Sequence, residues 1–267
     1  MSDSSIQRLI NALALPVSCG VNQRVPKKML IENGAPTAAD KRLFTDSIEE
    51  IQWLAALKPN SIGVPIWRDD EREYLEIAVL AITLRGDKPV NLPRLCELVH
   101  RAVPYPVLLM VPTPQGLSVS MAHKRWAQNE ADKVVLDGGV LMVDVGTELD
   151  PAHPFSKALA LRNQPQAHLN ALYEGWMACL LALQAARYTG FFMHKNDLQP
   201  VSTKREKLQQ YEQLAAQAES LRSQAAKAKQ LAQQVELNLA LQRVQVQLTQ
   251  ARGQLSNSTP QENQRIS

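Results

Sequence analysis

The chain has 267 residues, a formal net charge of +3 at pH 7, and 5% aromatic residues. This length exceeds one typical domain and is enough to bury a sizeable core. Residues 201–267 hold nine Lys and Arg against five Asp and Glu, so the upstream part is close to neutral. The composition therefore excludes a strongly basic nucleic-acid-binding domain and gives little support to an aromatic platform for single strands.

Two helices are predicted before the first strand. A serine at position 4 or 5 can cap a helix that runs to about Leu15, where Pro16 ends it. A second helix is expected over residues 35–57, because its apolar side chains recur at steps of three or four residues. This spacing predicts one continuous amphipathic helix.

A mixed sheet is expected next. Residues 74–84 are apolar on both alternating faces, which predicts a central strand covered on two sides. A helix near residues 92–102 leads to a hairpin over 106–125, and another strand-like run covers 133–145. A strongly apolar helix over 168–188 follows. The sequence therefore predicts an α+β fold with a mixed β-sheet flanked by helices.

The globular domain, residues 1–195, is followed by a glutamine-rich segment with leucine and alanine at helical spacing. It contains no glycine or proline between Pro200 and Gly253, and its apolar residues follow two heptads in different registers. We expect a coiled-coil helix over 201–255, with a register break near Val235–Leu241. We expect this helix to form a homo-oligomer through seven residues: Leu214, Leu221, Val235, Leu241, Val244, Leu248 and Leu255.

The segments that flank this core carry few structural signals. Residues 256–267 have almost no apolar content and are expected to be disordered. The first residues lack the basic start and the apolar run of a secretory signal, and no run is long enough to span a bilayer. Three scattered cysteines without paired spacing fit a reducing compartment. We therefore expect a cytoplasmic protein without membrane contact.

No complete catalytic motif occurs, and we expect no metal or cofactor. Glu76 needs a polar partner if it is buried, and we predict that Lys124, on the polar face of the hairpin's second strand, is that partner. A metal-dependent nuclease is the alternative interpretation. It would need an E-x-K strand to hold Mg²⁺, and that motif fails at Glu76. Only a rearranged site using Glu76 and Lys124 with Asp46 or Glu50 would serve.

A DNA-binding adaptor is a second alternative. Lys27, Lys28, Lys124 and Arg125 would meet phosphates if the fold brought them to one edge of the sheet. Dispersed charge that keeps the surface soluble is the other explanation of the same residues.

Five short motifs follow one another in the globular domain: VNQRVPKK (21–28), KRLFTD (41–46), AVPYPV (102–107), AHKR (122–125) and LYE (172–174). This succession resembles the bacterial domain-of-unknown-function family 4391 over about residues 1–190. The resemblance implies no activity, but it implies a setting beside DNA helicases and methyltransferases in restriction-like or phage-defence loci. The glutamine-rich coil departs from it and is expected to be particular to this chain. We therefore expect a non-enzymatic accessory or adaptor protein that associates through its coil.

Overall fold

The protein divides into two compact units, Met1–Cys179 and Leu180–Ser267. The boundary lies earlier in the chain than the predicted domain end at residue 195. The predicted disordered tail, apart from Ser256, lies outside the described residues. The structure is a computed structural model that describes residues 2–86, 89–127, 134–194 and 199–256.

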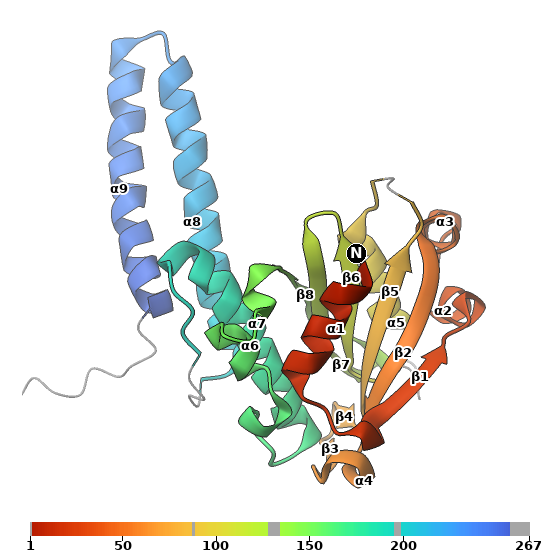
Figure 1. Cartoon of the computed structure of the whole chain (residues 1–267). Helices are drawn as coiled ribbons and strands as arrows, with labels where there is room; N and C mark the ends of the chain where they lie inside the picture. Colours follow the sequence, from red (N-terminus) through yellow and green to blue (C-terminus); the bar gives the residue numbers. More distant parts are fainter. Residues whose placement is uncertain (1, 87–88, 128–133, 195–198, 257–267) are drawn as a thin grey trace, which may run out of the picture. The chain divides into compact units, whose positions relative to one another are not determined.

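The first unit contains a six-stranded sheet and a separate two-stranded pair (Figure 1). The sheet consists of β1 (Gly20–Arg24), β2 (Ile48–Leu57), β5 (Ile77–Leu84), β6 (Val107–Thr113), β7 (Gly116–Trp126) and β8 (Val134–Val145) in that spatial order, and the pair of β3 (Trp67–Arg68) and β4 (Glu73–Tyr74). β5 and β6 run parallel because a helix connects them, whereas the other neighbours are antiparallel. The predicted mixed sheet is confirmed.

Helices and short 3₁₀ turns flank this sheet. The helices are α1 (Ser2–Leu13), α2 (Lys27–Gly34), α3 (Ala38–Ser47), α4 (Pro59–Ile62), α5 (Leu92–Ala102) and α6 (Pro154–Ala158), and the 3₁₀ turns are η1 (Val17–Cys19), η2 (Thr147–Leu149) and η3 (Leu161–Asn163). α2, α3 and α5 enclose one core with the sheet, in which Phe44, Leu98 and Leu109 are fully buried. α1 lies across the other face against β6 and β7 and buries Leu9 and Leu13.

The predicted helix over residues 35–57 is wrong in its second half. α3 ends at Ser47, and the chain continues directly into β2. The register of β2 on β5 shifts twice, after Ile48 and after Trp53. Such bulges add residues to one strand, so the buried Ile48 and Ile51 stand three residues apart and imitate the period of a helix.

The remaining predicted strands are confirmed. The expected ranges 74–84 and 133–145 contain β5 and β8, and the range 106–125 covers the β6–β7 hairpin except for its last residue, Trp126. The pattern gave no sign of β1 or α2. β1 is an edge strand whose residues are mostly exposed, so it lacks the alternating apolar side chains that identify a strand.

The second unit is helical. It contains the last part of α7 (Leu169–Thr189), then α8 (Val201–Lys227) and α9 (Leu231–Ser256). α8 and α9 lie side by side as an antiparallel hairpin that reverses at residues 228–230. The single long helix predicted over 201–255 is therefore wrong. None of the described helices combines the length and the hydropathy needed to cross a membrane.

Candidate functional site

The seam between α8 and α9 takes up most of the residues predicted for oligomerisation. Ala218 and Ala225 of α8 and Val244 and Ala251 of α9 are buried. Val235 is the exception among the seven predicted residues, because it is 51% exposed. The two heptads thus pair with each other inside one chain. Six predicted residues are buried or half-buried: Leu214, Leu221, Leu241, Val244, Leu248 and Leu255.

Polar contacts fix the open end of this hairpin to the end of α7. The Glu212 carboxylate accepts hydrogen bonds from Gln184 Nε2 at 3.2 Å and from the Tyr188 hydroxyl at 3.0 Å. Burial, and then the bond to Glu212, raises the pKa of Tyr188. From α9, Arg252 donates to the backbone oxygen of Thr189 at 3.4 Å. Both hairpin helices are therefore attached to α7 within the second unit.

A second apolar row of α9 is left uncovered. Its members are Leu231, Val235, Leu239 and Val246, which are 76%, 51%, 51% and 59% exposed. We call these four residues the outer row. With about 100° of rotation per residue around the helix axis, these four side chains span about 80°. The middle of this span points about 165° away from the apolar side chains of α9 that face α8. A helix that is apolar on two opposite faces is typical of the interior of a bundle.

Glu76 pairs with Lys58 and not with Lys124. The Lys58 Nζ lies 2.9 Å from Glu76 Oε2, and Glu76 is 6% exposed. The β2–β5 register joins Leu57 to Ile77, so the next residues along the two strands face each other. The hydrogen bond and charge of Glu76 raise the pKa of Lys58. The predicted Glu76–Lys124 pair is therefore wrong.

Lys124 belongs to a buried polar row on β7 that faces α5. It is 3% exposed, like the buried Ser118 and Ser120, and it donates to the backbone oxygen of Val103 at the end of α5. Burial lowers the pKa of Lys124 to about 7. His100 Nε2 lies 3.0 Å from Ser120 Oγ, and burial, followed by the charge of Lys124, lowers the pKa of His100 to about 3. This arrangement caps the C-terminal end of α5.

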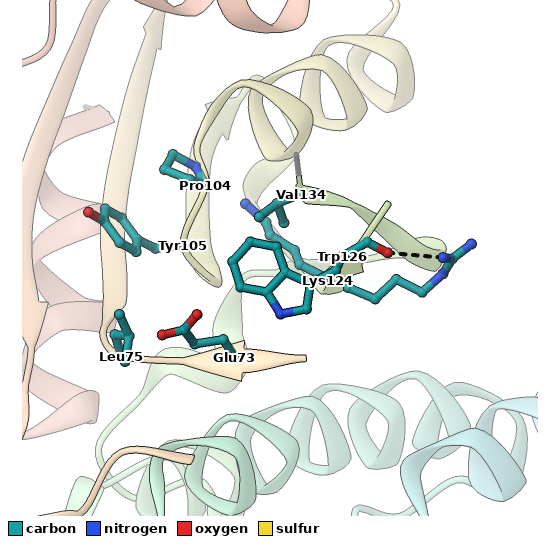
Figure 2. A pocket seen from close by; sticks show the side chains of 8 residues that line it. Glu73, Leu75, Pro104, Tyr105, Lys124, Trp126 and Val134 are labelled. Atoms are coloured by element: carbon teal, nitrogen blue, oxygen red, sulfur yellow. Dashed lines mark hydrogen bonds between the residues drawn. The ribbon is translucent and has the colours of Figure 1, made fainter. Parts of the chain in front are cut away.

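A pocket of about 110 Å³ lies beside Lys124. Figure 2 shows Trp126 in the middle of its lining, with Tyr105 and Glu73 around it. The Glu73 carboxylate is paired with Arg68. The walls come from β4, the loop after α5 and the end of β7, so no local pattern could have predicted them. The pocket is smaller than those that hold drug-sized ligands.

The four basic residues predicted to contact DNA do not form one surface. Lys27 Nζ donates to a backbone oxygen of β2 at 2.5 Å, and Lys28 lies 3.8 Å from a glutamate one turn further along α2. Lys124 is buried, and Arg125 lies 3.9 Å from Asp137 of β8. Of these four described residues, Lys28 alone has a largely exposed side chain.

Within the described ranges, no three His, Cys, Asp or Glu side chains are placed to hold one metal ion. Asp46 is exposed at the end of α3, and the Glu50 carboxylate lies 3.9 Å from Arg24. Glu76 is engaged by Lys58. Asp46, Glu50 and Glu76 are therefore not grouped around one position where a metal ion could bind.

Tyr173 is a structural residue that the sequence analysis missed. Its buried hydroxyl accepts from the Ala122 N–H at 2.9 Å and donates to the Val107 oxygen at 2.8 Å. The β6–β7 ladder ends at the pair Leu108–Met121, so this hydroxyl takes the place of the next ladder bond. Tyr173 lies in the LYE motif, but nothing in the sequence indicates which backbone groups it meets.

A comparison with curated proteins and another with solved structures give no match. A family model described as a domain of unknown function (DUF4391) matches residues 13–248. This match extends beyond the expected limit near residue 190 and includes α8 and α9 as far as Leu248. The hairpin, expected to be particular to this chain, is therefore largely covered by the family pattern. Since the match covers most of its length, the chain belongs to the domain-of-unknown-function family 4391.

Proposed function

We propose that this protein is a non-enzymatic accessory protein that binds another helix through the outer row of α9. The observation that carries this proposal is the presence of four largely exposed apolar side chains on one face of α9 while its opposite face already packs on α8. Scattered exposed apolar residues need no explanation, but a group of them on one helix face marks an interaction surface. Covering the row with a second helix removes its apolar area from water, which stabilises the complex by roughly 25 cal/mol per Å².

The setting we propose is a cytoplasmic DNA-processing or phage-defence complex. The family resemblance supports this setting, because it implies DNA helicases and methyltransferases as neighbours. The protein would act there as an adaptor that presents its hairpin to a second copy of itself or to one of those enzymes. The family match through most of the hairpin supports a shared role for this element.

The two alternative functions have less support. A nuclease built on Glu76 needs a carboxylate that is free to bind a metal, and the Glu76 carboxylate contacts Lys58 at 2.9 Å. A DNA-binding adaptor needs its basic residues on one surface, and Lys124 is 3% exposed.

The proposal is tested by comparing the wild type with two variants of the full chain. Leu239→Glu places a charge in the outer row, and Gln213→Glu places the same charge at an exposed position of α8. Each tagged chain is expressed beside a copy with a different tag and purified from native lysate. Bound proteins are identified by mass spectrometry.

We expect the wild type and Gln213→Glu to retain the same partner and Leu239→Glu to lose it, because a charge in the row opposes burial. Circular dichroism should show equal helix content in all three chains. If all three retain the same proteins, or if none retains a partner, association does not use the outer row and the proposed function is wrong.

A further inference from the structure

The two edges of the outer row differ in charge. Glu236 and Arg243 are exposed and lie seven residues apart, so they occupy the same edge of the row, only about 20° from one another around the helix. The other edge carries the exposed and uncharged Gln234, Asn238 and Gln245. One edge thus holds both charge signs near the middle of the row, whereas the charged residue of the other edge, Arg252, lies near the C-terminal end of α9.

This charged edge is complementary to itself. When two identical helices pair antiparallel about a two-fold axis, each edge of one helix meets the same edge of the other. With the axis between Leu239 and Ala240, Glu236 of one copy is level with Arg243 of the second copy, since both lie about 5 Å from the axis along the helix. Two ion pairs form. In a parallel pair Glu236 and Arg243 would instead meet the uncharged residues of the other edge at their level, and neither ion pair would form.

The apolar residues fit the same arrangement. Leu239 lies beside the axis and meets Leu239 of the second copy. Val235 of each helix is level with the gap between Gln242 and Val246 of the other helix, which is the position of a knob in a hole. Gln242 lies on the same face between Leu239 and Val246, and one polar residue in such an interface favours a single register.

We infer that the outer row of α9 binds α9 of a second copy of this chain in an antiparallel two-fold dimer, aligned by Glu236–Arg243 ion pairs. This inference rests on the proposed function and names the partner of the same surface. The two hairpins together place four helices side by side, with both α9 helices inside and one α8 on each outer side. Each α9 is then covered on both of its apolar faces.

Charge reversal in the purified full chain tests the arrangement. Light scattering over a concentration series should give twice the chain mass of 29.7 kDa. Glu236→Arg alone, or Arg243→Glu alone, turns both ion pairs into like-charge contacts and should raise the dimer Kd about tenfold. Combining the two substitutions restores opposite charges, and the Kd should return to the wild-type value. Gln213→Arg on α8 is the matched control and should leave the Kd unchanged.

Three results would overturn the inference. The antiparallel pairing is wrong if single reversals leave the Kd unchanged, or if the double reversal does not restore it. A chain that remains monomeric at every concentration excludes the second copy as partner. In that case the lysate purification decides. If Leu239→Glu loses a protein that the wild type retains, the proposed function stands with another partner. If Leu239→Glu retains that protein, both the proposed function and the dimer are wrong.

Discussion

Removing one hydroxyl should weaken the first unit measurably. Tyr173→Phe keeps the shape of the side chain but leaves the Ala122 N–H without its partner at 2.9 Å and the Val107 oxygen without its donor at 2.8 Å. Tyr173 is fully buried, so water cannot replace these bonds. An unpaired buried donor costs about 1–3 kcal/mol. We therefore expect a loss of about 2 kcal/mol, which lowers the Tm by about 4–8 °C in a unit of this size.

Differential scanning calorimetry measures this loss, with Tyr105→Phe as the matched control. Tyr105 is 37% exposed, so removal of its hydroxyl should change stability by less than about 0.5 kcal/mol. Hydrogen exchange gives an independent readout, because the Ala122 amide should exchange faster in Tyr173→Phe. If Tyr173→Phe melts with the wild type and the Ala122 amide keeps its protection, the hydroxyl does not stabilise the end of the β6–β7 ladder.

Three further predictions concern charged groups. Lys58→Ala should lower the free energy of unfolding in urea by about 1–2 kcal/mol, because it leaves the buried Glu76 carboxylate without its cationic partner. Adding Glu76→Gln removes that charge and should recover part of the loss. No recovery would mean that the charge is not the cause. Arg94 lowers the pKa of Asp40 to about 2, below its unfolded value of about 3.9, so this stabilisation is present above pH ~4 and is lost as the pH falls towards 2. Asp40→Asn should flatten the Tm between those pH values, and parallel curves would contradict this. Lys124 has a folded pKa of about 7, whereas a lysine in the unfolded chain keeps its proton up to about pH 10.4. The unfolded chain therefore binds more protons between about pH 7 and 10, and the stability of the wild type should rise over this range more than that of Lys124→Met. Equal slopes of Tm against pH would exclude this effect.

Regular burial made several elements predictable from the sequence. β5, the β6–β7 hairpin, α5 and α7 have apolar residues at a period of two, at a helical period, or in continuous runs, and these periods follow from local backbone geometry. β2 was misassigned because its two register shifts hide the period of a strand. That error also concealed the partner of Glu76, since Lys58 becomes its neighbour only when residues 48–57 pair with β5.

The sequence by itself determined that most of residues 201–255 are helical and which apolar residues form the faces that pair in the hairpin, because heptad spacing depends only on the helix repeat. The reversal at residues 228–230 was not predictable, since neither glycine nor proline marks it. Two heptads can pair within one chain or between chains, and a short loop favours the first by raising their effective concentration. Only the tertiary structure shows that this pairing uses Val244 and its neighbours and leaves the outer row exposed.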